Sequence, residues 1–279
     1  MKHLLLFLTI LTLATMACGF SVNIPPVPTP GPEVTDEITV ATPDSEGTRL
    51  KISFGAGELT LSPGATDMLV EGTATYDIPN FKPEVIKNGN EVEIKQGQVK
   101  TLNVTDFKNE WDLNLGETPI ELEINAGAYK GRYEFGGLAL TDLTIKDGAS
   151  DVVVSFSEPN PTEMSVFRYE TGASSVELIG LANANFSTLI FNGGAGSYTL
   201  DFSGELGQDA TARVETGFGD LNLVVPEGVD ARVTVEGGPV NVNHSSGWGQ
   251  SNHTYTQEGS GPTLTIIVKV GAGNVTITD

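Results

Sequence analysis

Glycine recurs through this chain at a nearly constant spacing, with apolar residues at fixed offsets on both sides of it. Gly148, Gly172, Gly194 and Gly217 are separated by 24, 22 and 23 residues. The residues five and three before each glycine, and four and six after it, are apolar: Leu143, Ile145, Val152 and Val154; Phe167, Tyr169, Val176 and Leu178; Leu189, Phe191, Tyr198 and Leu200; Ala212, Val214, Leu221 and Leu223. Alternation at period two indicates strands with one buried face. The register therefore predicts a strand, a glycine turn and a second strand, repeated.

The same register continues on both sides of this central part. Gly55 and Gly271 have apolar residues at all four offsets, and Gly238 has them at three, with His244 at the fourth. The half that follows Gly127 departs from the pattern with Gly131 and Tyr133. We expect glycine at these turns because it adopts a positive φ at little steric cost.

A recurrence of about 22 residues is typical of a solenoid, in which each coil covers the apolar face of its neighbour. We therefore predict an all-β, repetitive β-solenoid-like domain. A β-sandwich with regular strands is the alternative, because strands about every ten residues suit both folds.

Two segments depart from the repeat. Between Pro63 and Trp111 the pattern loosens, and residues 85–94 are typical of a hairpin with an Asn-Gly turn. Since Gly55 and Gly127 are 72 residues apart, about three repeat lengths, we interpret this segment as an elaboration on one coil. The second segment lies between Gly238 and Gly271.

The N-terminus resembles a bacterial lipoprotein signal. Lys2 and His3 precede an apolar run that is too short to span a membrane, and Cys18, the chain's one cysteine, follows Ala17. We expect residues 1–17 to be a signal peptide and Cys18 to be lipidated, which would hold the protein on a membrane. Thr15 stands where such signals usually carry an aliphatic residue, so ordinary cleavage after Ala17 is the alternative. Both interpretations predict export.

The segment that follows is rich in proline and threonine. We expect residues 18–48 to be the lipidated cysteine and an extended tether, because proline favours the polyproline conformation. Residues 49–279 are then the β-repeat domain.

Composition limits the possible partners. The 279 residues carry a formal net charge of −21, and such an acidic surface repels phosphate backbones, so we expect no nucleic-acid partner. The expected partners are a membrane, reached through the N-terminal lipid, and a protein or glycan that the sequence does not identify.

The sequence contains three candidates for metal or partner binding. His244 and His253 are weak metal candidates, with Glu258 or Asp279 as a third ligand. The alternative for that segment is a structured loop that packs Trp248 and Tyr255. His244, Trp248, His253 and Tyr255 are also the candidate residues of an interaction loop. Gly217–Leu223 resembles calcium-binding glycine-aspartate repeats, but those require a nine-residue period. We expect no metal and no cofactor.

Catalysis is also not expected. No serine lies in a nucleophile-elbow context, and the glycine-rich turns precede strands rather than phosphate-binding helices. Asp142, Asp147 and Asp151 lie close together in sequence, but we expect them in turns and on outward faces, where solvated charge is usual. The chain is therefore predicted not to be an enzyme.

Several segments together resemble the toast-rack domains of bacterial envelope proteins. They are Phe81–Val85, the strand end Ile94–Gln96, Trp111, the serial Leu-x-Ile-x-x-Gly-Ala-x-x-Val-x-Leu units, and the ending from Trp248 to Val275. The resemblance covers residues 49–279. It implies a β-solenoid-like module with a structural or adhesin-like binding role, or alternatively an envelope-stress accessory that regulates a membrane partner, and it supplies no catalytic residues.

Overall fold

A computed structural model describes residues 29–44, 47–97 and 106–279. The described part is almost entirely β-structure, with two short 3-10 helices, η1 (Pro79–Phe81) and η2 (Leu181–Ala184). The strands are β1 (Val34–Val40), β2 (Thr48–Pro63), β3 (Val70–Tyr76), β4 (Pro83–Asn88), β5 (Glu91–Gln96), β6 (Asn109–Leu115), β7 (Ile120–Glu134), β8 (Leu140–Asp147), β9 (Ala149–Ser155), β10 (Met164–Ile179), β11 (Phe186–Asp201), β12 (Ala210–Val224), β13 (Asp230–Gly237), β14 (Val240–His244), β15 (Gly249–Ser251), β16 (Thr254–Gln257) and β17 (Thr263–Thr278).

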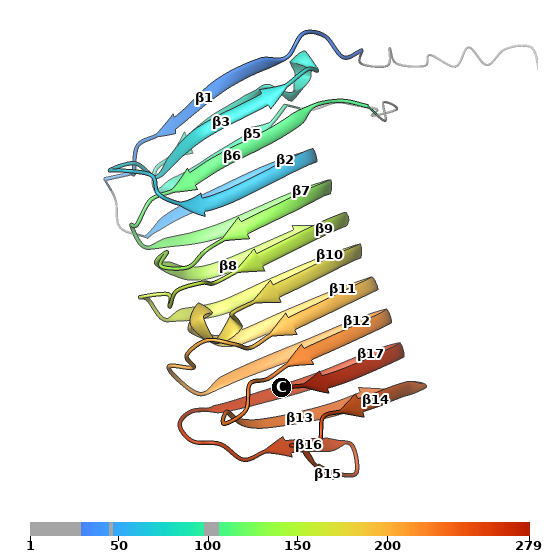
Figure 1. Ribbon diagram of the computed structural model, residues 1–279. Coiled ribbons are helices and arrows are strands. Elements are labelled where there is room, and N and C mark those ends of the chain that lie inside the picture. Colours follow the sequence, from blue (N-terminus) through green and yellow to red (C-terminus); the bar gives the residue numbers. More distant parts are fainter. Residues whose placement is uncertain (1–28, 45–46, 98–105) are drawn as a thin grey trace, which may run out of the picture.

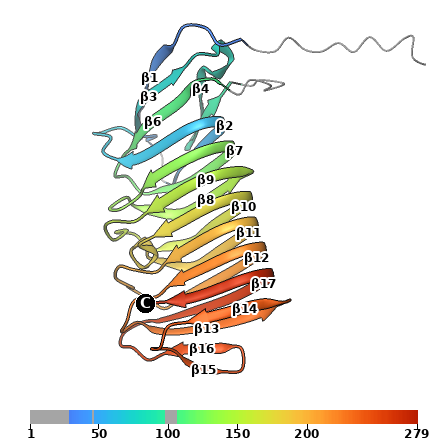
Figure 2. The same ribbon diagram turned by 45° about the vertical axis from the view of Figure 1, so that its right-hand side comes forward.

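The repeating unit is a rung that bends at its glycine. The long strands β2, β7, β10, β11, β12 and β17 each run through the bend, so that their two halves lie in opposite sheets (Figures 1 and 2). Neighbouring rungs pair in parallel and in register, with Leu189 opposite Ala212 before the bend and Tyr198 opposite Leu221 after it. The predicted strand, glycine turn and strand, and the all-β solenoid-like fold, are therefore confirmed.

Inward side chains of both sheets form one continuous core. In β11, Leu189 and Phe191 before the bend and Tyr198 and Leu200 after it are at most 1% exposed. The ring of Phe191 packs edge-on against Tyr198 at 5.1 Å between centroids. Each rung covers the apolar side chains of its neighbour, and this burial is the main force that holds the stack together.

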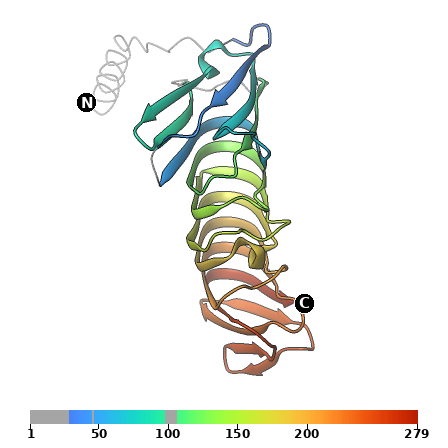
Figure 3. The ribbon, with the colours of Figure 1, turned by 90° about the vertical axis from the view of Figure 1, so that its left-hand side faces the viewer.

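The rungs do not follow sequence order at the two ends of the stack. β7 pairs directly with β2, although β3 to β6 lie between them in sequence. β17 inserts between β12 and β13, so the C-terminus lies part-way along the stack rather than at its end (Figures 1 and 3).

The interpretation of the segment from Pro63 to Trp111 as an elaboration on one coil is wrong. β5 and β6 form a further rung beyond β2. β4 then pairs antiparallel with β5, and β3 and β1 extend the other sheet antiparallel to β6. The segment is thus the N-terminal end of the stack. The predicted hairpin is present, but its two-residue loop is Gly89-Asn90, with Gly89 at φ 62°, rather than Asn-Gly.

The boundary of the tether at residue 48 is also wrong. Residues 34–40 form β1, which pairs with β3 along its whole length. Ile38 and Val40 point into the core and are at most 3% exposed. The β domain therefore includes residues assigned to the tether. Residues 1–28, which contain the expected signal peptide and Cys18, lie outside the described residues.

The glycines at the bends serve a different purpose from the one expected. Gly127, Gly172, Gly194, Gly217 and Gly271 do not have positive φ values. Instead, a Cβ on any of them would lie 2.2–2.7 Å from the carbonyl oxygen of the glycine on the adjacent rung. The bends stack so closely that only a hydrogen fits between them, and this close approach explains why glycine recurs.

The glycine column ends on two polar side chains at the N-terminal end. On the rung made by β5 and β6, the side chain of Gln96 lies over Gly55 in place of a stacked glycine. There, Gln96 Oε1 accepts a hydrogen bond from the Gly55 N–H at 2.8 Å, and Asn109 Nδ2 donates to the Ala56 carbonyl at 2.6 Å. The two amides replace backbone bonds that a further bend would supply.

The irregular half of the Gly127 rung has a packing explanation. A Cβ on Gly131 would lie 2.9 Å from the Tyr129 ring and 3.0 Å from the Tyr133 ring. The two tyrosine rings thus occupy the volume that an apolar side chain fills in other rungs.

Candidate functional site

The predicted interaction loop forms the C-terminal end of the stack. β15 and β16 are a hairpin that pairs with β13 through β16. Trp248 and Tyr255 are 5% and 4% exposed and belong to the core, whereas His244 and His253 are exposed. The His244 ring lies 5.2 Å from the Tyr255 ring, and His253 lies in the turn between β15 and β16. The two aromatic residues therefore cover the end of the core and leave the histidines on the surface.

The metal candidates have no recognisable ligand cluster around them. Within residues 29–44, 47–97 and 106–279, no group of three or more histidine, cysteine, aspartate or glutamate side chains is placed to hold a metal ion. Asp220, in the calcium-like segment, accepts a hydrogen bond from Asn274 Nδ2 at 2.7 Å, and Asn241 Nδ2 donates to Asn274 at 3.3 Å. An amide therefore occupies the neighbouring position where a stacked calcium site would need an acidic ligand.

The three aspartates considered for catalysis are separated by the fold. Asp151 forms an ion pair with Arg132 at 3.1 Å. Burial, followed by the nearby charge of Glu121, raises the pKa of Asp142. Asp147 does not lie on an outward face as predicted, because it ends β8 one residue before the bend, where the alternation of side chains directs it inward.

Asp147 is the centre of a cluster of hydroxyl groups. Its carboxylate accepts hydrogen bonds from Tyr169 at 2.8 Å, from Tyr129 at 3.4 Å and from Thr171. Tyr133 donates to the Tyr129 hydroxyl at 3.1 Å. Burial, reinforced by the Asp147 charge, raises the pKa of Tyr169 well above its usual value, so this tyrosine remains a donor to the carboxylate. The cluster satisfies a polar group at the edge of the core.

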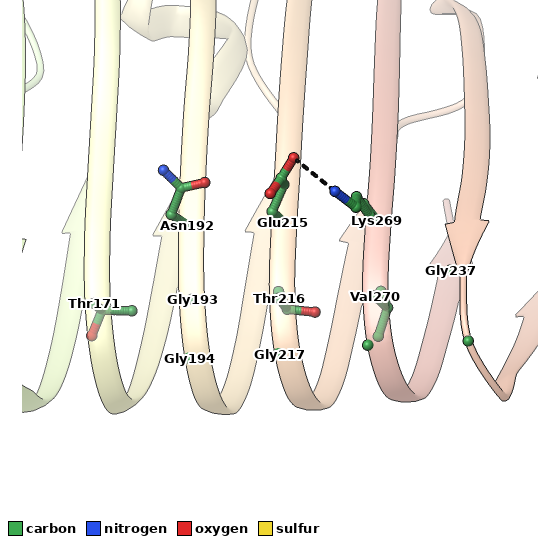
Figure 4. A pocket seen from close by; sticks show the side chains of 12 residues that line it. Thr171, Asn192, Gly193, Gly194, Glu215, Thr216, Gly217, Gly237, Lys269 and Val270 are labelled. Carbon is green, nitrogen blue, oxygen red and sulfur yellow. Dashed lines mark ion pairs between the residues drawn. The ribbon is translucent and has the colours of Figure 1, made fainter.

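A shallow groove of about 720 Å³ runs across several rungs at the glycine bends (Figure 4). The missing side chains of the glycine column create its floor. The outward side chains of Asn192, Glu215 and Lys269 stand side by side along it, on adjacent rungs. Glu215 and Lys269 form a loose ion pair of 3.8 Å, and both are more than 60% exposed. The other lining residues are Thr171, Gly193, Gly194, Thr216, Gly217, Gly237, Gly238, Val270 and Gly271.

One large apolar side chain is exposed beside this groove. Phe218 follows Gly217, which lines the groove, and is 66% exposed. The residue that follows the bend glycine is alanine on the other rungs of this register, apart from proline after Gly238. Phe218 pairs with Ala195 on one side and Ala272 on the other. This departure is present in the sequence, but the apolar offsets that define the repeat describe only inward positions and so do not include it.

No described helix is long and apolar enough to cross a lipid bilayer. No curated protein matches the chain.

Solved structures show similarity over most of the chain. A "putative cell adhesion protein" from Clostridium sporogenes is 20% identical, with a TM-score of 0.49 over 88% of this chain and 99% of that one. A "putative adhesin" from Bacteroides fragilis is 12% identical, with a TM-score of 0.42 over 88% and 97% of the two chains. A "putative adhesin" from Parabacteroides merdae is 14% identical, with a TM-score of 0.39 over 88% and 96%.

A family match accounts for the N-terminal half of the stack. Residues 29–179 match the family model described as the N-terminal domain of toast_rack, DUF2154. The matched span begins before β1 and ends with β10, so it contains the N-terminal end of the stack and the first bent rungs. Since the match covers more than half of the chain, this protein belongs to the toast-rack N-terminal domain family.

Proposed function

We propose that the chain is an exported binding module of the adhesin-like kind, held on a membrane by a lipid on Cys18. The observation that carries the binding role is a long, regular stack with polar outer faces, which the described N-terminal segment joins at one end. Gly31 donates a hydrogen bond to the Asp77 carbonyl beside β3, so the chain enters next to β1. The hairpin of β15 and β16 lies at the opposite end (Figure 1).

The dimensions suit presentation away from a surface. One sheet runs through β1, β3, β6, β2, β7, β9, β10, β11, β12, β17 and β14. At about 4.8 Å between strands, this sheet spans roughly 50 Å. An N-terminal lipid would therefore leave both faces and the far hairpin accessible to a partner.

The proposal is of binding rather than catalysis. Asp147 is occupied by hydroxyl donors and Asp151 by Arg132. The groove at the bends is shallow and open, whereas catalytic sites usually exclude water. Repeated rungs with an accessible face are typical of proteins that bind extended partners.

Replacing Cys18 by alanine tests the anchor. We expect the natural chain to remain in the membrane pellet after a high-salt wash and to be released by detergent. The Cys18→Ala variant should appear in the soluble exported fraction, because it lacks the acyl chains. A Ser21→Ala variant is the matched control and should fractionate like the natural chain. Membrane association of Cys18→Ala equal to that of the natural chain would show that the lipid anchor is wrong.

The binding role needs a separate measurement. We expect the purified full-length chain, displayed on beads, to retain intact cells or envelope fragments more than beads carrying a charge-matched acidic protein. Retention at the level of the control beads would contradict an adhesin-like role. Selective recovery of a membrane regulator from solubilised envelope, without retention of cells, would instead support an envelope-stress accessory.

A further inference from the structure

The groove at the glycine bends has polar side chains along one side. Asn192, Glu215 and Lys269 line it, two residues before their bend glycines. The residues that follow the glycines on the same three rungs are Ala195, Phe218 and Ala272, which are next in sequence to the lining glycines but are not among the residues that line the groove. Phe218 is therefore a large exposed side chain next to the lining residue Gly217, with alanine at the same position on both neighbouring rungs.

Exposure of Phe218 has no packing explanation. Alanine at the same position on the neighbouring rungs shows that the bend does not need a large side chain there. Leaving a phenyl ring in water forgoes the favourable transfer free energy that its burial would give. An exposed aromatic ring beside convergent polar groups is a usual mark of a binding site.

A second, independent feature lies beneath the groove floor. Tyr198 is 1% exposed, and its hydroxyl has no hydrogen-bond partner among the described residues. The hydroxyl would lie 2.9 Å from a Cβ on Gly193, which lines the groove. A buried hydroxyl without a hydrogen-bond partner is energetically unfavourable. The end of the Tyr198 ring thus lies against the inner side of the groove floor, beneath Gly193 and Gly196.

We propose that this groove binds a neutral oligosaccharide, with one sugar ring stacked on Phe218 and its hydroxyl groups bonded by Asn192, Glu215 and Lys269. This inference deepens the proposed binding function and rests on it. A sugar ring offers a face of C–H groups for an aromatic ring and a rim of hydroxyls for amide, carboxylate and ammonium groups. The loose, exposed ion pair of Glu215 and Lys269 can open to bond such hydroxyls.

Other partners fit the groove less well. An anionic polymer would meet a chain of net charge −21. A peptide strand would need a free sheet edge, but β11, β12 and β17 pair on both sides along the groove. A second copy would bring another net charge of −21 against a narrow strip of surface, far from the area that stable dimers bury.

Titration calorimetry of the full-length chain with cellotetraose and chitotetraose tests the proposal, in a detergent without a sugar headgroup. We expect saturable heat with at least one of these probes, and weaker or no binding of polygalacturonate. Phe218→Ala should weaken binding at least about tenfold, the loss of one aromatic anchor, while Phe218→Tyr should retain it. Ile86→Ala removes another exposed apolar side chain, on β4, and should leave binding unchanged.

The contrary outcomes are distinct. No heat with either neutral probe at millimolar concentration, or equal affinity in Phe218→Ala, would overturn the proposal. Preference for polygalacturonate would assign a different ligand class. A dimer in sedimentation that Phe218→Ala dissociates would make the ring a self-association contact. Retention of cells by the chain despite a failure of these tests would leave the proposed binding function standing and reject this groove as its site.

Discussion

Replacing Gly194 by alanine is expected to lower the free energy of unfolding by about 3 kcal/mol. The added Cβ would lie 2.2 Å from the carbonyl oxygen of Gly172 on the adjacent rung. Gly194 does not have a positive φ, so the loss of stability would come from this contact and not from backbone strain. Backbone atoms cannot rotate away as a side chain does, so two paired rungs must separate. At this chain length, thermal unfolding should move down by roughly 6–12 °C.

The matched control lies in the same column of glycines. A Cβ on Gly148 would be 3.2 Å from the Gly127 carbonyl oxygen, a contact that a small shift relieves. Gly148→Ala should therefore cost less than about 1 kcal/mol. Circular dichroism melts and urea titrations of both variants check the difference. Equal losses would show that glycine is required for backbone freedom at the bends rather than for close stacking.

The sequence was sufficient to predict the rung and insufficient to predict the order of rungs. Apolar residues around Gly194 alternate regularly enough to define both strands and the bend. The order of the rungs at the two ends of the stack could not be predicted in this way, because each rung presents the same apolar faces and the same glycine to its neighbours. Nothing in the register indicates that β17 inserts between β12 and β13 and pairs with both of them. Pairing of β2 with β7 likewise depends on long-range competition between similar surfaces.

The errors at single residues have simpler causes. Asp147 stands one residue before its glycine, and continuing the alternation that places Ile145 inside would have placed it inside as well. The prediction followed the general preference of aspartate for solvent, and the hydroxyl donors that reverse this preference come from other rungs. β1 was missed because only Ile38 and Val40 of its residues are buried, which leaves a pattern too short to separate from the polar segment before it.

Phe218 shows that a departure from the repeat can indicate a candidate contact site and not only a feature of the fold. Positions that face inward are constrained by packing, so their departures, such as Gly131, have packing explanations. Positions just after the bend face solvent and are alanine on most rungs, so a phenylalanine there is a departure that packing does not require. Candidate contact sites in a repeat protein are therefore better sought among outward positions that break the repeat than among those that follow it.

Asn160 is a residue that the sequence analysis did not single out and whose loss should have a large effect. Its side chain is 3% exposed and lies between β9 and β10. Oδ1 accepts hydrogen bonds from the N–H groups of Leu140 and Thr162, at 3.2 and 3.0 Å. Nδ2 donates to the carbonyls of Leu140 and Ala184, at 2.8 and 3.2 Å. The amide of Asn160 thus links β8, η2 and the loop between β9 and β10.

Asn160→Leu removes all four bonds from a buried position and is expected to destabilise the fold by about 3–5 kcal/mol. Asn160→Asp keeps the shape but directs a carboxylate oxygen at two carbonyl oxygens, so it should also destabilise near neutral pH. Burial and these carbonyls would raise the pKa of the new acid, and protonation would restore one donor. The penalty of Asn160→Asp should therefore shrink as the pH falls through that pKa, whereas the penalty of Asn160→Leu should not change with pH.

Asn243→Asp, on the exposed strand β14, is the control and should alter stability by less than about 0.5 kcal/mol. Chemical unfolding of the three variants at pH 7 and pH 5 measures each difference, and a pH-independent loss in Asn160→Asp would show that the two carbonyl contacts do not hold this amide in place.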